Sequence, residues 1–162
     1  MQTRYYPIAL KLKNRIAVVA GGGLVSERKI KILLKAGARV RVISPILTPA
    51  LRRLVKCHRI IWLPKKIQAA DIYPADIVIS ATSESGANKK VSLWARKRKV
   101  LVNVVDRARL SDFISPALLY MPKAIVAIYT EGKDPVLSRD LKNFLKERWD
   151  EFLSYRDRLQ KG

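Results

Sequence analysis

The residues best suited to chemistry are a run of glycines near the start of the chain. Gly21, Gly22 and Gly23 follow the apolar run 16–20 and precede a stretch with helical spacing. Glycines allow a tight turn and a close approach of the backbone, and the free N–H groups at a helix start favour negative charge. The pattern is G-x-G-x-x-S, with Ser26 in place of a third glycine. It indicates a site for a dinucleotide pyrophosphate; the alternative is a plain turn that joins a strand to a helix.

Polar residues follow three further apolar runs. Ser44, Pro45 and Ile46 stand where such folds usually carry an acid that binds the ribose hydroxyls. A serine hydroxyl and backbone amides can serve instead, and the lack of an acid leaves both NAD and NADP open. Thr82 and Asn103 lie at the ends of later runs, and the carboxyl ends of parallel strands surround the cofactor crevice. Thr82 could alternatively be a turn or capping residue.

Asp106 is the best catalytic candidate. It comes directly after the apolar run 100–105, beside the expected nicotinamide position. A carboxylate there could take a proton while a hydride leaves the substrate. Its alternative role is to start a turn before Arg107. Asp112 is a second candidate, although its surroundings are equally typical of the entry to a strand.

Composition limits the class of protein. The chain has 162 residues, 49% of them hydrophobic, which is enough for one domain or one domain with a small appendage. It has no apolar run near the ~20 residues of a membrane span, and its start lacks a signal-peptide pattern. Cys57 and His58 are the only cysteine and histidine. Two adjacent residues cannot build a metal site alone, and a single cysteine fits a reducing cytoplasm.

The chain is strongly basic. Its net charge is +20, and residues 1–60 hold 14 lysines and arginines against one acid, Glu27. Such a field attracts polyanions: nucleic acid, or a small substrate with many carboxylates. It could also serve solubility. The sequence lacks a nucleic-acid motif, and aromatic residues are not interleaved with the basic ones, which disfavours nucleic acid.

The elements that must position these residues alternate between strand and helix. This order predicts an α/β fold with a Rossmann-type parallel sheet in an NAD-binding domain of residues 1–112. The expected strands are residues 16–20, 40–43, 60–63, 76–81 and 100–105, and the expected helices are 24–35, 49–57 and 85–98.

The pattern changes in residues 113–162. Two apolar runs, 113–120 and 123–130, are separated by Met121 and Pro122 and predict a hairpin. Pro135 opens one long amphipathic helix. This hairpin-plus-helix region could cover its own core, but we expect it to form a homodimer. The apolar side of the helix comprises Leu137, Leu141, Phe144, Leu145, Trp149, Phe152 and Leu153.

Taken together, these segments resemble the precorrin-2 dehydrogenase family, which includes the N-terminal part of sirohaem synthases. The likeness spans about residues 5–150. It rests on YPI leading to LK (6–13), VVAGGGLVSERK (18–29), AGARV (36–40), LVNVVD (101–106), DFISPA (112–117) and, more weakly, TEGKDPVLSR (130–139).

The resemblance implies a function and roles for residues. The family oxidises precorrin-2, a tetrapyrrole with eight carboxylates, to sirohydrochlorin, with NAD as hydride acceptor. It implies a homodimer and a general base at Asp106. Some members also insert iron, and the sequence leaves that activity open. With this function, we expect the glycine turn with Leu24 and Val25 to bind the pyrophosphate, Ser44–Ile46 to meet the adenosine half, and Thr82 and Asn103 to line the nicotinamide side.

The sequence departs from the family pattern in two places. The usual Ser-Gly-Gly-x-Ser-Pro stretch is here Thr130 to Pro135, with Glu131 in place of a glycine, and Ser111 replaces a frequent cysteine. The chain also ends soon after residue 155, where many members continue into a further helical segment. The altered stretch 130–135 and the early end of the chain favour an alternative function: a non-catalytic module that holds NAD or a tetrapyrrole and binds a partner enzyme of the pathway.

Overall fold

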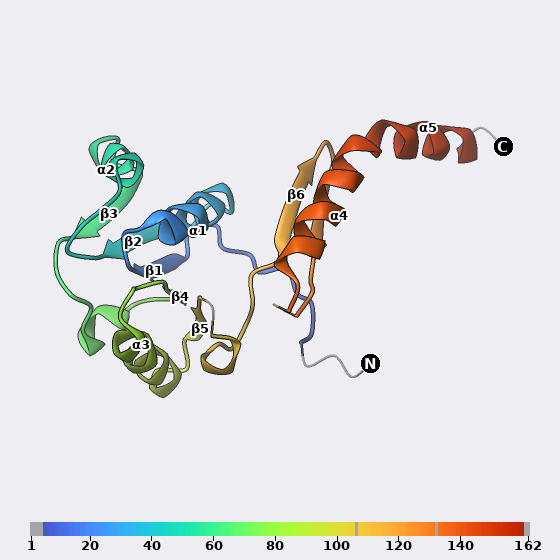
Figure 1. The fold of residues 1–162 in the computed structure, drawn as a ribbon. Helices are drawn as coiled ribbons and strands as arrows, with labels where there is room; N and C mark the ends of the chain where they lie inside the picture. Colours follow the sequence, from blue (N-terminus) through green and yellow to red (C-terminus); the bar gives the residue numbers. More distant parts are fainter. Residues whose placement is uncertain (1–4, 106, 132, 161–162) are drawn as a thin grey trace. The chain divides into compact units, whose positions relative to one another are not determined.

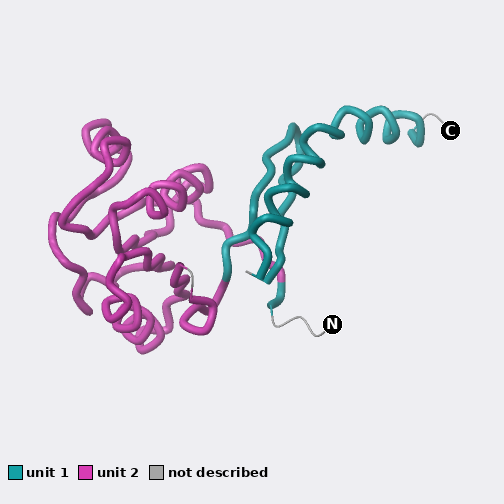
Figure 2. The backbone as a smooth tube through the Cα atoms, viewed as in Figure 1, with its two compact units in different colours: residues 1–6, 114–162 teal, residues 7–113 magenta. Residues whose placement is uncertain are grey.

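The computed structural model describes residues 5–105, 107–131 and 133–160. The chain forms two compact units, whose boundary falls after Phe113 (Figure 2). The larger unit comprises residues 7–113, and the other comprises residues 114–160 with Tyr5 and Tyr6. Within these described residues, no helix has the length and apolar character needed to cross a membrane.

The larger unit is a five-stranded, entirely parallel sheet in the order β3-β2-β1-β4-β5, as the alternation of elements predicts (Figure 1). The strand order reverses at β1: β2 and β3 lie on one side of it, and β4 and β5 lie on the other. Its elements are β1 (Ile16–Ala20), α1 (Leu24–Lys35), β2 (Arg39–Ile43), α2 (Pro49–Lys56), β3 (Ile60–Leu63), β4 (Ile77–Ser80), α3 (Ser85–Lys97) and β5 (Leu101–Val104), with short 3₁₀ helices at Ala69–Ile72 and Ala108–Leu110.

Alternation of side chains along the strands gives the sheet two buried faces. Val19 belongs to a core cluster with Ile30 of α1 and Leu51 of α2. Its neighbour Val18 belongs to a second cluster with Val91 of α3. Because both faces are covered by helices, the strands are mostly apolar, as in other parallel sheets; the polar exceptions are Arg39, Arg41, Ser80 and Asn103. The strand ends that precede α1, α2 and α3 therefore meet at one edge of the sheet.

Gly37 ends α1 and leads the chain into β2. Gly37 has a φ of 78°, a conformation that glycine adopts without strain. Its N–H donates to the carbonyl of Leu34, and the following N–H, of Ala38, donates to that of Leu33. This pair of bonds is a Schellman motif, which satisfies the last carbonyls of a helix. The chain can then enter β2 directly.

The smaller unit contains the expected hairpin with different bounds. β6 (Ala117–Met121) pairs antiparallel with β7 (Ala124–Ile128), and Met121 lies opposite Ala124. The turn therefore consists of Pro122 and Lys123, the latter with a φ of 66°, rather than of Met121 and Pro122. Residues 113–116 precede the strand instead of belonging to it.

The prediction of a single long C-terminal helix is wrong. Two helices, α4 (Pro135–Glu147) and α5 (Trp149–Leu159), meet at Arg148, whose φ of −95° and ψ of 10° are not helical. Figure 1 shows the resulting bend. Helix breaks usually occur at proline or glycine, and neither is present, so the sequence carries no signal for this one. A contact between the rings of Trp149 and Phe152, 5.2 Å apart, stabilises the first turn of α5.

Candidate functional site

The carboxyl ends of β1, β2 and β4 surround a cavity of about 990 Å³. It lies beside β1, where the strand order reverses. This is the usual ligand position in open α/β sheets. Nine of the residues predicted to bind a cofactor line it: Gly21, Gly22, Gly23, Leu24, Val25, Ser44, Pro45, Ile46 and Thr82. Sequence reasoning did not identify other lining residues, including Lys66, Ile67, Glu84, Lys90 and Trp94.

The three glycines of the turn are required for different reasons. A Cβ on Gly21, whose φ is 111°, would lie 2.3 Å from the carbonyl oxygen of Ala81. A Cβ on Gly22 would lie 2.1 Å from the carbonyl oxygen of Ile46. Gly21 and Gly22 therefore allow the turn to pack against the chain itself. A Cβ on Gly23 would meet no atom within 4 Å, and its φ of −85° suits any residue. Nothing in the fold requires a glycine at Gly23, which borders the cavity.

The start of α1 offers polar groups without internal partners. Gly23 is the N-cap and supplies no side-chain cap, so the first N–H groups of the helix lack a side-chain acceptor there. The hydroxyl of Ser26 is fully buried in the first turn and has no hydrogen-bond partner. Free N–H groups at a helix start favour an anionic group such as a pyrophosphate. The residues present at this end of the cavity fit a dinucleotide.

Glu27 ties the first turn of α1 to the start of α2. Its carboxylate accepts hydrogen bonds from Lys31 Nζ at 2.6 Å and from Thr48 Oγ1 at 2.9 Å. The Thr48 hydroxyl also accepts the Leu51 N–H and so caps α2. The hydrogen bonds from Lys31 and Thr48 lower the pKa of Glu27 from its ordinary value. Its negative charge is thus held by neighbouring groups beside the glycine turn.

This lowered pKa predicts a pH-dependent effect on stability. A carboxylate whose pKa is lower in the folded state stabilises the fold above its unfolded pKa, and the contribution is lost as the pH falls through the folded pKa. We therefore expect Glu27→Gln to lower the free energy of unfolding near neutral pH and to have little effect once Glu27 is protonated. Urea unfolding of both proteins at a series of pH values, from neutral into the acid range, measures this difference. A loss that stays equal across the whole series would contradict the assignment.

At the end of β2, the polar groups of Ser44 are already engaged. Its hydroxyl donates to the carbonyl of Ile46 at 2.8 Å, and its carbonyl accepts the indole N–H of Trp62 at 2.8 Å. These bonds fix the loop that turns from β2 into α2. Ile46 itself is 70% exposed on the cavity rim. An exposed apolar side chain at this point is suited to contact a flat ring.

Charged residues lie on the opposite rim of the cavity. Lys66 Nζ and Glu84 Oε1 form an ion pair at 2.8 Å that joins the loop after β3 to the loop before α3. The hydrogen bond between them raises the pKa of Lys66 and lowers that of Glu84. Lys90 of α3 also lines the cavity. Among the described lining residues Glu84 is the one carboxylate, so the cavity wall is weakly cationic.

Asn103, the tenth residue predicted to bind the cofactor, is not among the residues that line this cavity. It is buried in β5, where its amide Nδ2 donates to the carbonyl of Phe113 at 2.9 Å. Its Oδ1 is buried without a hydrogen-bond partner. Asp106 lies outside the described residues.

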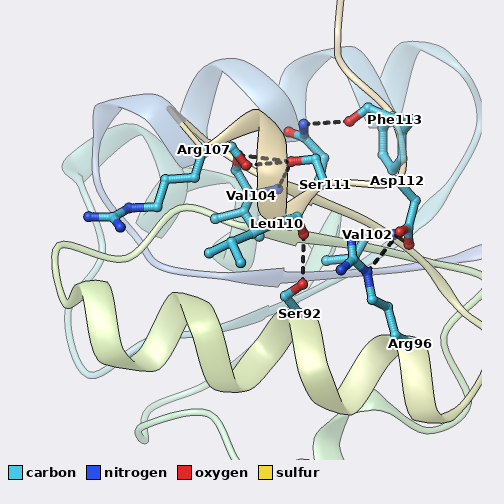
Figure 3. Close-up of polar contacts among 10 residues, drawn as sticks. Ser92, Arg96, Val102, Val104, Arg107, Leu110, Ser111, Asp112 and Phe113 are labelled. Atoms are coloured by element: carbon cyan, nitrogen blue, oxygen red, sulfur yellow. Dashed lines mark hydrogen bonds and ion pairs between the residues drawn. The ribbon is translucent and has the colours of Figure 1, made fainter. Parts of the chain in front are cut away.

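The segment that follows β5 is fastened to that strand (Figure 3). Ser111 Oγ accepts the Val104 N–H at 2.8 Å and lies 3.1 Å from the Val104 carbonyl oxygen. The Asp112 carboxylate accepts the Val102 N–H at 3.1 Å and pairs with Arg96 Nε at 2.9 Å. Asp112, the second catalytic candidate, is thus occupied by structural contacts.

Cys57 and His58 are remote from the cavity lining. Both lie at the carboxyl end of α2, and Cys57 is exposed as a free thiol. Within the described ranges, no three histidine, cysteine, aspartate or glutamate residues come close enough together to hold a metal ion.

Fold and cavity define a dinucleotide-binding α/β protein, and comparison with known proteins specifies its class. A family described as "Putative NAD(P)-binding" matches residues 8–117, and the chain belongs to that family. This agrees with the prediction of a nicotinamide dinucleotide cofactor, which rests on the glycine turn.

Particular relatives are similar over most of the chain. Siroheme synthase 1 of Serratia proteamaculans (strain 568) is 39% identical over 142 residues, which are 88% of this chain and 30% of that protein. The siroheme synthase of Thioalkalivibrio sulfidiphilus (strain HL-EbGR7) is 40% identical over 139 residues, or 86% of this chain and 28% of that protein. The chain therefore spans less than a third of the length of these curated relatives.

A solved structure named "SirC, precorrin-2 dehydrogenase" is also similar. It has a TM-score of 0.81 and 26% sequence identity, and the match covers 97% of this chain and 78% of that one. Together with the siroheme synthases, it confirms the predicted family resemblance and the predicted fold.

Proposed function

We propose that this protein oxidises precorrin-2 to sirohydrochlorin with NAD as the hydride acceptor. The observation that carries the proposal is the likeness of nearly the whole chain to a precorrin-2 dehydrogenase, at a TM-score of 0.81. The siroheme synthases, at 39–40% identity, support the same pathway. The cavity at the reversal point of the sheet supports it independently, because a dehydrogenase of this fold binds its dinucleotide there.

The cavity supports a specific orientation of the dinucleotide. The open space beside Gly23 and the free N–H groups of α1 suit the pyrophosphate. The exposed Ile46 suits the adenosine half. We assign the pyrophosphate to Gly21, Gly22, Gly23, Leu24 and Val25, the adenosine half to Ser44, Pro45 and Ile46, and the nicotinamide half to Thr82. Asn103 is given no contact with the dinucleotide, because it is buried and does not line the cavity.

Asp106 is assigned as the proton acceptor. Both of its neighbours in the chain are held by backbone bonds: Val105 N–H donates to the Ser80 carbonyl at 2.9 Å, and Arg107 N–H to the Val104 carbonyl at 3.2 Å. These bonds tie Val105 to the carboxyl end of β4 and Arg107 to that of β5. NAD⁺, when bound, supplies the hydride acceptor, and a carboxylate supplies the base for the proton lost with it. The structural contacts of Asp112 favour Asp106 over Asp112 for this role.

The charge of the chain fits the proposed substrate. Precorrin-2, the substrate that the family resemblance implies, carries eight carboxylates. The protein has a net charge of +20. Such a field would raise the local concentration of a polyanion and speed its association, an effect that falls with ionic strength.

Anaerobic incubation with precorrin-2 and NAD⁺ tests the proposed function. Absorbance spectra should show sirohydrochlorin and reduced coenzyme formed in equal amounts. Tight binding of the tetrapyrrole without any reduced coenzyme would instead identify a non-catalytic module of the pathway. Lack of binding to either compound would overturn the proposal.

We further propose that the protein is a cytoplasmic homodimer that pairs through its smaller unit. Among the described residues, three large apolar side chains on one side of α4 are exposed: Leu137 at 54%, Leu141 at 40% and Phe144 at 56%. A run of exposed large apolar side chains on one helix face is typical of an interface. The free thiol of Cys57 fits a reducing compartment.

The dimer proposal predicts the effect of one charge on this face. Light scattering should give the wild-type protein twice the 18.4 kDa mass of the chain. Phe144→Glu should reduce the mass to that of a monomer, because an unpaired charge in an apolar interface is costly. Asn143→Glu adds the same charge to another side of the helix and should leave the dimer intact. A monomeric wild-type protein, or equal effects of the two substitutions, would contradict the proposal.

A further inference from the structure

The loop between β4 and α3 has to leave the sheet and form a wall of the cavity. Ala81 is still bonded to the sheet, since its N–H donates to the Ala20 carbonyl at 2.8 Å. Thr82, which lines the cavity, is the first residue beyond the sheet. Its backbone N–H and carbonyl need new partners, because a backbone polar group that is removed from water without a hydrogen bond costs free energy.

The side chain of Asn88 supplies both partners. Its Nδ2 donates to the Thr82 carbonyl at 3.0 Å, and its Oδ1 lies 3.3 Å from the Thr82 N–H. The same Oδ1 accepts the hydroxyls of Ser80 at 2.7 Å and of Thr82 at 2.8 Å. Asn88 is 6% exposed and sits in the first turns of α3. Its carboxamide makes the two backbone hydrogen bonds with Thr82 that a neighbouring strand would make inside the sheet.

This loop meets the glycine turn directly. The carbonyl oxygen of Ala81 is the atom that would lie 2.3 Å from a Cβ on Gly21. The wall held by Asn88 and the turn at the start of α1 are therefore in close contact on two sides of the same cavity. A small displacement of Thr82 would change the width of the cavity at this point.

The network also defines what Thr82 can offer a ligand. Its hydroxyl has one hydrogen, and that hydrogen is directed to Asn88 Oδ1 at 2.8 Å or to the Glu84 carbonyl at 3.1 Å. With either partner, only an acceptor lone pair remains for the cavity. Thr82 would therefore recognise a donor, such as a ribose hydroxyl or a carboxamide N–H.

We propose that Asn88 is a positioning residue for the dinucleotide: it fixes the Ala81–Thr82 wall and turns Thr82 into a hydrogen-bond acceptor. This inference rests on the proposed function, because it presumes that the cavity binds a nicotinamide dinucleotide. Asn88 lines no part of the cavity itself and acts through Thr82.

The test compares Asn88→Ala with Ser92→Ala in the full chain. Ser92 lies one turn further along α3, is 2% exposed and donates one hydrogen bond, to the Leu110 carbonyl at 2.7 Å, away from the cavity loop. We expect Asn88→Ala to raise the dissociation constant of NAD⁺ by about tenfold or more, the scale seen when a residue that orients a ligand-binding group is lost. Ser92→Ala should change it by no more than about twofold.

Two further measurements separate positioning from a general loss of stability. Amide hydrogen exchange at Thr82 should accelerate in Asn88→Ala and stay unchanged in Ser92→Ala. In steady-state kinetics, Asn88→Ala should raise the KM for NAD⁺ more than it lowers kcat.

The outcomes are distinct. Equal dissociation constants for wild type and Asn88→Ala, or equal weakening by both substitutions, would overturn the inference and leave the proposed function intact. If calorimetry detects no binding of NAD⁺ or NADP⁺ to folded wild-type protein, both the proposed function and this inference are wrong.

Discussion

Asp106→Ala should lower the turnover of precorrin-2 by about 10²–10⁴-fold, the usual contribution of a general base. The reason is that the proton lost from the macrocycle would have no acceptor next to the hydride-transfer site. Binding of NAD⁺ should be unchanged, because the residues assigned to the pyrophosphate and the adenosine half lie in the loops after β1 and β2 and in the first turn of α1. Reduced-coenzyme absorbance measures the turnover, and titration calorimetry measures the binding.

Asp157→Ala is a suitable control for this experiment. Asp157 is an exposed carboxylate of α5, paired with Arg156, and removing it changes the net charge by the same amount. It should retain normal turnover. If Asp106→Ala also turns over precorrin-2 at a near-normal rate, Asp106 is not the base, and another group accepts the proton.

The second large effect is expected from a pair of identical substitutions in the glycine turn. Gly21→Ala should lower the free energy of unfolding by about 2–4 kcal/mol, because of its left-handed φ and the 2.3 Å approach to Ala81. Gly23→Ala should cost no more than about 1 kcal/mol, because its Cβ meets no neighbour and only the preference for glycine over alanine at the N-cap is lost. It should nonetheless weaken NAD⁺ binding by about 10²-fold, because the methyl group occupies space assigned to the pyrophosphate.

Denaturant unfolding and calorimetry on both variants check this pair. The contrast matters more than either value, because one glycine is needed by the fold and the other by the ligand. A Gly23→Ala protein that binds NAD⁺ as tightly as wild type would show that the pyrophosphate does not lie against this turn.

Much of the larger unit could be predicted because its signals are local. An apolar run, a glycine turn and a helix closed by Gly37 follow one another within the first forty residues, and each signal acts on its own neighbours. Nine of the ten residues predicted to bind a cofactor line the cavity for the same reason, since strand ends in a parallel sheet meet at one edge.

The remaining features depend on contacts between distant segments. Nothing about Asn88 in the sequence says that its amide will meet the backbone of Thr82, and the ion pair between Lys66 and Glu84 joins two loops 18 residues apart. The break at Arg148 has no proline or glycine to mark it. Patterns of hydrophobicity identify which face is buried, but they do not specify which polar group a side chain will reach.

The fastening of the segment after β5 has a consequence for the behaviour of the protein in concentrated solution. β5 is the last strand of its sheet, where bare N–H and C=O groups would recruit a strand from another molecule. Instead, Asp112 bonds to both backbone groups of Val102, through its carboxylate and its own N–H, and Ser111 Oγ contacts both backbone groups of Val104. With these groups already satisfied, the β5 edge of the sheet resists edge-to-edge aggregation.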